Sequence, residues 1–267
     1  MIKILLDTMG GDHPEENEKA YDLINGKYED LEVVMVKGDN PSDSLKTAYE
    51  ALKDGEKYGG LVTMGETRDV IIGAMNYIGL KPGIIRPVIC PILPTITDGF
   101  VGLCDSGAIV NVTPEHLLQY AILGSEFMEK ACNIKNPRVA LLNIGVEEEK
   151  GDELHREAYK LLKACDKINF LGNVEPREFQ TGGYDLVVSD GFSGNIMLKA
   201  IEGINEIILK LFGQYLPKEA EIMNYRNYAG AAVLGTNKLI MKVHGFGDAR
   251  AIARAIEQAY NMEKNRL

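Results

Sequence analysis

The sequence lacks the features that mark several common classes of protein. No apolar stretch reaches the 18 residues that a membrane-spanning helix needs, and the apolar segment at the N-terminus is too short for a signal peptide. The 29 Lys and Arg residues are outnumbered by 39 Asp and Glu, which argues against the clustered positive charge of a broad nucleic-acid interface. We therefore expect a cytoplasmic protein without a nucleic-acid partner.

Motifs for metals and cofactors are also missing. The chain has no CxxC pair and no histidine at metal-ligand spacing from any of its scattered cysteines, Cys90, Cys104, Cys132 and Cys165. These residues fit buried, reduced thiols. No GxGxxG fingerprint, Walker pattern or GxSxG elbow is present. We expect no metal, no nucleotide cofactor and no serine-hydrolase chemistry.

The apolar pattern predicts an α/β architecture. Six runs of strand length are continuously apolar, as in strands of a parallel sheet covered on both faces: Ile2–Asp7, Leu31–Val36, Gly60–Met64, Arg138–Ile144, Asp185–Asp190 and Lys238–Val243. Segments with helical periodicity lie between them, two of which begin at the expected cap residues Thr113 and Asp248. Residues 83–112 are broken by Pro and Gly and predict short strands or hairpins. The chain is expected to form one α/β domain over 1–267, or two closely packed lobes with 83–112 at the junction.

Four glycine-bearing turns after predicted strands give the strongest functional signal: "DTMGGDH", "NIGVEEEKGDEL", "SDGFSGN" and "HGFGDAR". In an open parallel sheet, ligands bind beyond the carboxyl ends of the strands, where helix N-termini attract anions and glycine lets the backbone come close. The turns also carry polar side chains, which are His13, Lys150, Asn195 and His244, with Lys242 nearby. This inventory predicts a phosphate or acyl-phosphate site.

Each motif alone also has a plainer explanation. Glycine turns are common connectors, and His13 also suits the capping of a turn. Asn195 stands where a helix begins and suits a helix cap. Lys150 follows three glutamates, as in a solvated run of charges. The hypothesis of a site therefore depends on the four loops meeting at one pocket.

At these turns the sequence resembles the phosphate acyltransferase PlsX family. The resemblance covers nearly the whole chain and is carried by ordered blocks such as "MGGDH", "RPVICPILPT", "PEHLLQYAILGS", "NPRVALLNIG", "NFLGNVEPRE", "SDGFSGN" and "GAAVLGTNKLIMKVHGFGDAR". It implies a three-layer α/β/α sandwich related to isopropylmalate dehydrogenases and phosphotransacetylases, and a homodimer. It also implies transfer of an acyl group from acyl carrier protein to inorganic phosphate in phospholipid synthesis.

The resemblance implies roles for particular residues. Lys150 and Asn195 are the expected catalytic residues, where Lys150 neutralises phosphate or the developing oxyanion and Asn195 donates a hydrogen bond to that oxygen. The residues expected to bind phosphate or substrate are Gly10, Gly11, Asp12, His13, Asp190, Gly191, Gly194, Lys242, His244 and Gly245.

Three departures from the family pattern bear on the substrate. "MGETRD" replaces the family's "AGNTGA", so that Glu66 and Arg68 stand in place of Asn and Gly, and Ile109 replaces an Asn in "DSGAIVNVTPEHL". The chain is also shortened, notably around "ILKLFGQYLPKEAEIMNYRNYAG", which weakens the expectation of membrane contact. A salt-linked Glu66–Arg68 pair that narrows the acyl channel would favour short chains, as in a phosphotransacylase using a coenzyme A (CoA) thioester. A noncatalytic binding or scaffold protein is the other alternative.

Overall fold

The computed structural model describes residues 1–54, 57–217, 224, 230–245 and 247–265. The chain divides into two compact units. Unit 1 comprises Met1–Pro87 and Arg226–Leu267, and unit 2 comprises Val88–Tyr225. One boundary thus falls inside the 83–112 segment, whereas the close packing of two lobes stays a prediction. Phe246 and much of the shortened segment after Leu216 lie outside the described residues.

Unit 1 contains a mostly parallel set of five described strands. Their order is β2 (Leu31–Val36), β1 (Ile2–Asp7), β3 (Gly60–Thr63), β10 (Leu239–Val243) and β9 (Gly230–Leu234). The first four run parallel, and β9 runs antiparallel to β10. Leu5 at the centre of β1 pairs with Val34 on one side and Leu61 on the other. The continuous apolar runs therefore form strands as predicted, although the sequence did not signal β9.

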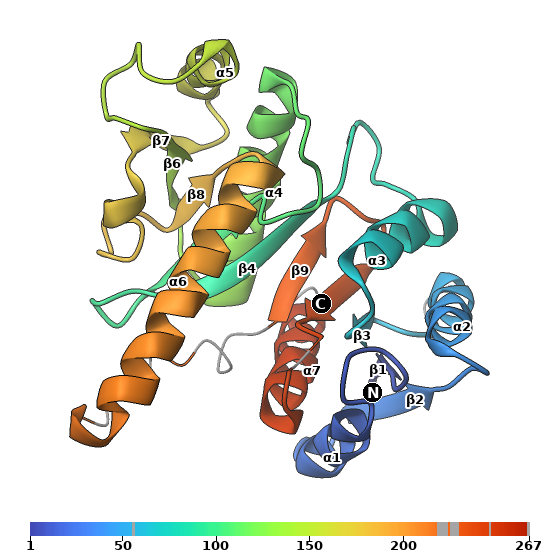
Figure 1. Ribbon diagram of the computed structural model, residues 1–267. Coiled ribbons are helices and arrows are strands. Elements are labelled where there is room, and N and C mark those ends of the chain that lie inside the picture. The colour runs from blue at the N-terminus through green and yellow to red at the C-terminus, as the bar shows by residue number, and fades with distance from the viewer. Residues whose placement is uncertain (55–56, 218–223, 225–229, 246, 266–267) are drawn as a thin grey trace. The chain divides into compact units, whose positions relative to one another are not determined.

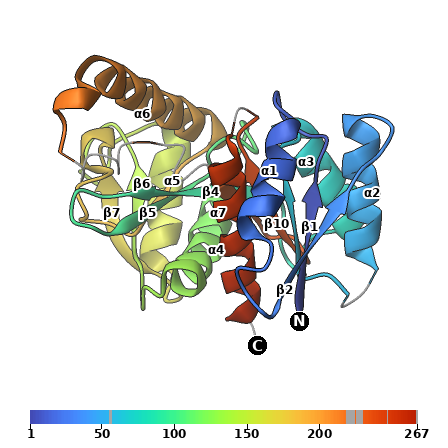
Figure 2. The same cartoon turned by 90° about the horizontal axis from the view of Figure 1, so that it is seen from below.

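Helices cover both faces of the unit 1 strands (Figure 2). Helices α1 (Glu15–Ile24) and α7 (Ala249–Lys264) lie on one face, and α2 (Pro41–Lys53) and α3 (Thr67–Gly73) lie on the other, where a π-helical turn, η1 (Ala74–Ile78), continues α3. The predicted cap at Asp248 is confirmed, because its carboxylate accepts a hydrogen bond from the Ala251 amide at 2.9 Å. Ile252 and Ile256, four residues apart on α7, are completely buried.

Unit 2 also has five described strands, in a mixed arrangement. Their order is β4 (Val88–Pro94), β5 (Phe100–Cys104), β8 (Leu186–Val188), β6 (Arg138–Leu142) and β7 (Asn169–Val174). The hairpin predicted within 83–112 is confirmed, because β4 and β5 pair antiparallel. Strands β5, β8, β6 and β7 are parallel, so their carboxyl ends share one edge. The strand arrangement is mixed, because an antiparallel pair occurs in each unit.

The unit 2 strands alternate their side chains between two helical layers. Leu103 and Val187 belong to a buried cluster with Met197 and Leu198 of α6 (Gly191–Phe212). The neighbouring residues point the other way, toward α4 (Pro114–Cys132), where a side chain at Gly124 would meet Leu186. Helix α5 (Glu153–Ala164) packs beside α4, and short 3-10 turns occur at η2 (Pro176–Glu178) and η3 (Gly213–Tyr215). Strands thus lie between helices in this unit too (Figure 1).

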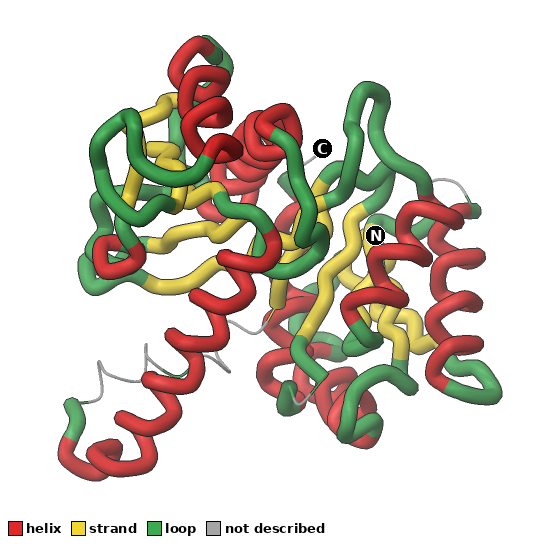
Figure 3. The backbone as a smooth tube through the Cα atoms, turned by 45° about the horizontal axis from the view of Figure 1, so that its top comes forward, coloured by secondary structure: helices red, strands yellow, loops and turns green. Residues whose placement is uncertain are grey.

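Helix α6 is a long continuous helix whose C-terminal part extends past the strands of unit 2 (Figures 1 and 3). Its buried residues all lie between Gly191 and Glu202, and none lies in the ten residues that follow. Within the part of the chain that the structure describes, no helix is both long and apolar enough to cross a membrane.

Candidate functional sites in the two units

The first cluster forms at the carboxyl ends of β1 and β3 in unit 1. Asp7, the last residue of β1, is fully buried, and its carboxylate accepts hydrogen bonds from the hydroxyls of Ser44 at 2.6 Å and Thr63 at 2.7 Å. The Thr63 hydroxyl in turn accepts the Gly65 amide at 2.9 Å. A buried carboxylate needs such donors. Asp7 therefore ties α2 and the exit of β3 to the turn that follows β1.

The glycines of that turn are required by close packing. A side chain at Gly10 would come within 2.7 Å of the Gly65 nitrogen, and Gly11 has a φ of +87°, which disfavours other residues. The Asp12 amide donates to the carbonyl of Gly245 at 2.7 Å. The structure therefore brings together Gly10, Gly11, Asp12 and Gly245, from turns that lie far apart in the sequence.

The basic side chains predicted for this cluster differ in their surroundings. His13 is exposed and lies 3.4 Å from the carboxylate of Glu15. The Lys242 ammonium donates to the carbonyl of Val243 at 3.1 Å, and His244 is half-buried. Neither Glu66 nor Arg68, both exposed, has an ion-pair partner among the described residues. The structure thus gives no support to the expected salt link between them.

The second cluster surrounds the start of α6 in unit 2. Asp190 is the helix cap, and one carboxylate oxygen accepts the amides of Phe192 and Ser193, both at 2.9 Å. The Gly191 amide donates to the Ile109 carbonyl at 3.0 Å. These amides already donate to acceptors within the protein. An anion that bound at this helix terminus would have to displace those acceptors. Asp190 and its glycines hold the helix start in place, and their binding role stays a prediction.

Asp105 fixes the loop that meets this helix start. Its carboxylate, which is fully buried, accepts four backbone amides at 2.7–3.2 Å, those of Ile89, Gly107, Ala108 and Ile109. Burial raises the pKa of Asp105 even though these hydrogen bonds favour its charged form. Gly107 has a φ of +133°, and a side chain there would lie 3.3 Å from the amide oxygen of Asn195. Asn195 therefore sits against a glycine held in place by Asp105.

Lys150 lies in the loop that joins β6 to α5. Its side chain is 45% exposed, and its ammonium is 4.0 Å from the carboxylate of Glu147. An exposed pair at that distance contributes little. Because β6 and β8 are adjacent and parallel, Lys150 and Asn195 follow neighbouring strands at the same edge of the sheet. The structure thus places both expected catalytic residues at one edge of unit 2.

Sequence reasoning missed four buried polar residues that support these loops: Asp7, Asp105, Asn143 and Asn173. Each of them ends an apolar strand or lies near its end, and this position was the signal in the sequence that could have identified them.

The predicted site residues are divided between the two units. The phosphate-site candidates Gly10–His13 and Lys242–Gly245 belong to unit 1, while Lys150, Asp190, Gly191, Gly194 and Asn195 belong to unit 2. The meeting of all four turns at one pocket stays a prediction.

Known proteins similar to this chain agree on fold and family. Solved structures with the same fold include the EutD phosphotransacetylase from Staphylococcus aureus, with a TM-score of 0.69 at 14% identity over 99% of this chain and 94% of that one. A branched-chain phosphotransacylase from Enterococcus faecalis V583 has a TM-score of 0.67 at 14% identity over 98% and 99% of the two chains. At such identities the similarity shows the fold alone. The predicted phosphotransacetylase-like α/β fold is confirmed.

Sequence relatives are more informative. A phosphate acyltransferase from Clostridium tetani is 34% identical over 328 aligned positions, which cover 100% of this chain and 96% of the relative. One from an Exiguobacterium species is 38% identical over 257 positions, which cover 90% and 77%. The first alignment is longer than this chain, as expected for a shortened relative. Residues 18–267 match the family described as fatty acid synthesis protein. The chain therefore belongs to this family, the PlsX-type phosphate acyltransferases.

Proposed function

We propose that the protein is an enzyme that transfers an acyl group from a thioester to inorganic phosphate, giving an acyl phosphate for phospholipid or fatty acid metabolism in the cytoplasm. The thioester is carried by acyl carrier protein or by CoA. The observation that carries the proposal is the 34% identity over the full chain to a phosphate acyltransferase. The position of Lys150 and Asn195 at one sheet edge supports it.

The reaction needs positioning and charge stabilisation rather than a covalent nucleophile. Phosphate attacks the thioester carbon, the carbonyl oxygen becomes negative, and the thiolate then leaves. In this proposal the Lys150 ammonium neutralises the negative charge of phosphate or of the oxyanion. The Asn195 side-chain amide donates a hydrogen bond to the same oxygen. Both side chains are exposed and so accessible to substrate.

The phosphate is assigned to the turns of unit 1. Gly10 and Gly11 keep the backbone free of side chains, and His13, Lys242 and His244 add groups that can donate to or carry positive charge toward an anion. The Asp12 amide already donates a hydrogen bond to the Gly245 carbonyl. In this proposal Asp12 therefore holds the turn in place and does not donate its amide to phosphate.

The noncatalytic alternative rests on departures such as Ile109. In the structure, residue 109 contributes through its backbone, whose amide donates to Asp105 at 2.7 Å and whose carbonyl accepts from Gly191 at 3.0 Å. Replacing the family's Asn side chain leaves both bonds available. The short-chain alternative relied on a Glu66–Arg68 ion pair, which is absent from the ion pairs of the described residues. Neither alternative gains support.

The test is release of free thiol from acyl thioesters of graded chain length, on acyl carrier protein or CoA, in the presence of phosphate. We expect phosphate-dependent release, and we expect Lys150→Ala to lower kcat by about 100- to 1,000-fold, the effect of losing one group that stabilises an oxyanion. Lys160→Ala is the matched control, because Lys160 is an exposed lysine that pairs with Glu157 on α5. If no thioester releases free thiol, the proposed function is refuted. If Lys150→Ala keeps full activity, the catalytic role of Lys150 is refuted.

A further inference from the structure

The Lys150 loop, residues Ile144–Gly151, is anchored by two buried asparagines. The Asn143 side chain bridges the loop, since its oxygen accepts the Ile144 amide at 2.8 Å and its nitrogen donates to the Lys150 carbonyl at 3.1 Å. The Asn173 nitrogen donates to the Glu147 carbonyl at 2.7 Å. Both side chains are nearly inaccessible, with exposed fractions of 6% for Asn143 and 4% for Asn173.

The pairing of β6 with β7 fixes the positions of the two asparagines. Asn173 is part of β7 and pairs with Leu141 of β6, two residues before Asn143. The Asn143 amide donates to the Val174 carbonyl at 2.9 Å, which extends the ladder between the two strands. An exposed loop rich in glutamate is thereby tied at two carbonyls to the sheet, and one of them is the carbonyl of Lys150 itself.

Two glycines complete the support of the Lys150 side chain. A side chain at Gly145 would lie 2.9 Å from the Lys150 Cγ, so the aliphatic stem of Lys150 runs closely along this glycine. Gly151 has a φ of +88°, and a side chain there would meet the Asn143 oxygen at 2.7 Å. Gly145 therefore leaves room for the stem of Lys150, whereas the 4.0 Å pairing with Glu147 contributes little to its orientation.

The side-chain oxygen of Asn173 also indicates a specific role for this residue. Its side-chain oxygen is buried and has no hydrogen-bond partner among the described residues. A buried acceptor without a partner is unfavourable, and native proteins contain few of them. An apolar residue would avoid this penalty, but it would not hold the Glu147 carbonyl.

We propose that Asn143 and Asn173 are positioning residues that hold the Lys150 ammonium where the acyl-transfer reaction needs it, an inference that rests on the proposed function. Neither asparagine need touch the substrate. Each acts through the backbone of the Lys150 loop, and the precision they supply matters because small displacements of a charge-stabilising group lower the rate of the chemical step.

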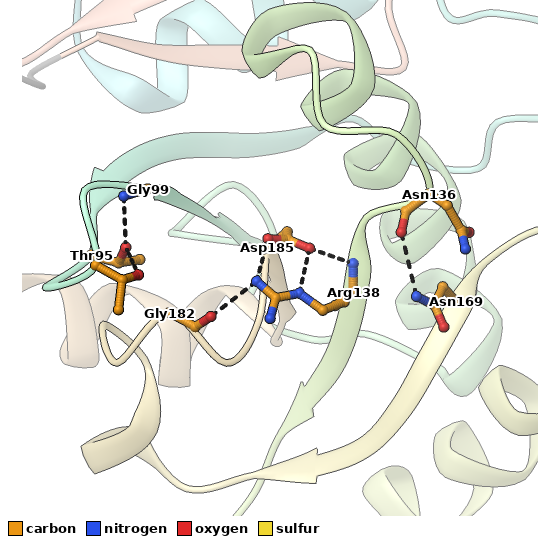
Figure 4. A network of polar contacts seen from close by, with 8 residues as sticks. Thr95, Gly99, Asn136, Arg138, Asn169, Gly182 and Asp185 are labelled. Atoms are coloured by element: carbon orange, nitrogen blue, oxygen red, sulfur yellow. Dashed lines mark hydrogen bonds and ion pairs between the residues drawn. The ribbon is translucent and has the colours of Figure 1, made fainter.

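The test compares two substitutions on the same strand. Asn173→Asp replaces the donating nitrogen by an oxygen of similar size, which repels the Glu147 carbonyl. Asn169→Asp is the control, because Asn169 makes the same kind of bond, at 3.4 Å to the Asn136 carbonyl, at the opposite end of β7 (Figure 4). We expect Asn173→Asp to lower kcat by about 10- to 100-fold while the KM for the thioester stays within about threefold, and the control to match the wild type.

A second measurement separates positioning from general loss of structure. In a Lys150→Ala background, Asn173→Asp is expected to leave the residual kcat unchanged, because both changes remove the same contribution. If Asn173→Asp does not fold, as judged by its melting temperature, Asn173→Ala and Asn143→Ala replace it in the same comparison. An active wild type whose variants keep kcat within about twofold overturns the positioning role alone. A wild type that releases no thiol overturns the proposed function instead.

Discussion

Gly194 shows at the residue scale how tightly the start of α6 is seated. A side chain at this position would overlap the Asp105 carbonyl oxygen, and it would lie 3.3 Å from the Ser189 hydroxyl. Both neighbours are buried, and one is backbone, so neither moves aside easily. We expect Gly194→Ala to lower the free energy of unfolding by about 1–3 kcal/mol, the usual effect of overpacking, despite the better helix propensity of alanine.

The matched control for this substitution is Gly203, on the same helix, where a side chain would meet no atom within 4 Å. There only the helix propensity acts, and Gly203→Ala is expected to stabilise the protein by up to about 1 kcal/mol. Urea unfolding of both variants provides the measurement. Effects of equal sign would contradict the packing argument.

At the scale of elements, an ion pair fastens the start of β6 to the loop before β8. Arg138 donates to the Asp185 carboxylate through Nε at 2.9 Å, through Nη2 at 2.8 Å and through its backbone amide at 2.7 Å, and Nη2 also reaches the Gly182 carbonyl (Figure 4). Burial would raise the pKa of Asp185, but the Arg138 hydrogen bonds outweigh it and the pKa is lowered.

This lowered pKa determines how the pair responds to pH. The folded state binds the proton less readily than the unfolded state, whose Asp pKa is about 3.9. The stabilisation is therefore fully present above about pH 4 and is lost as the pH falls through the folded pKa. We expect Asp185→Asn to lower the free energy of unfolding by about 1–3 kcal/mol at pH 7.

The difference between wild type and Asp185→Asn should shrink as the pH falls below about 4, because protonation removes the same charge in the wild type. Denaturant unfolding at a series of pH values measures it. Glu157→Gln provides a control, since it removes one partner of the exposed 2.7 Å pair with Lys160 and should have little effect at any pH. A difference for Asp185→Asn that is independent of pH would show that packing, not charge, is responsible.

For the molecule as a whole, the sequence predicted the elements better than the way in which they pair. Continuous apolar runs identified β1 and β2 to the residue, because burial on both faces leaves a strong local signal. The sequence did not predict the antiparallel strand β9, nor did it predict the asparagines that support the Lys150 loop. Asn173 lies beside Leu141 only through the register of β6 and β7, and such pairing between distant segments leaves no pattern in either segment alone.

The same limit applies to the candidate site. Glycine turns after strands correctly indicated where backbones approach closely, since a side chain at Gly11 would lie 2.8 Å from the Gly245 carbonyl oxygen, which accepts a hydrogen bond from the Asp12 amide. They did not reveal that the amides at the start of α6 are already occupied by Asp190 and Ile109. The acceptor to which each amide donates depends on the tertiary structure, whereas a sequence motif shows only that the amide is present.

An exposed apolar surface at the C-terminal end of α6 predicts self-association. Along the extending part of α6 and the turn after it, five large apolar side chains are each more than half exposed: Ile204, Ile207, Leu211, Phe212 and Tyr215. Ile204, Ile207 and Leu211 follow one another at spacings of three and four residues on α6, so they share one face of the helix. An exposed apolar face of this kind is typical of an interface. We expect a homodimer formed through this face, as the resemblance to the family implied. The 29.4 kDa chain should then show twice its mass by light scattering during size-exclusion chromatography.

Ile207→Glu places a charge in the centre of this apolar surface, and we expect it to shift the dimer to the monomer mass, because an unpaired charge buried at an interface is strongly unfavourable. Ile85→Glu is the control, since Ile85 is an exposed isoleucine of unit 1, far from α6 in the sequence. It should leave the mass unchanged. A wild type of monomer mass at all concentrations would refute the dimer, and an Ile207→Glu variant that keeps the dimer mass would assign the dimer to a different surface.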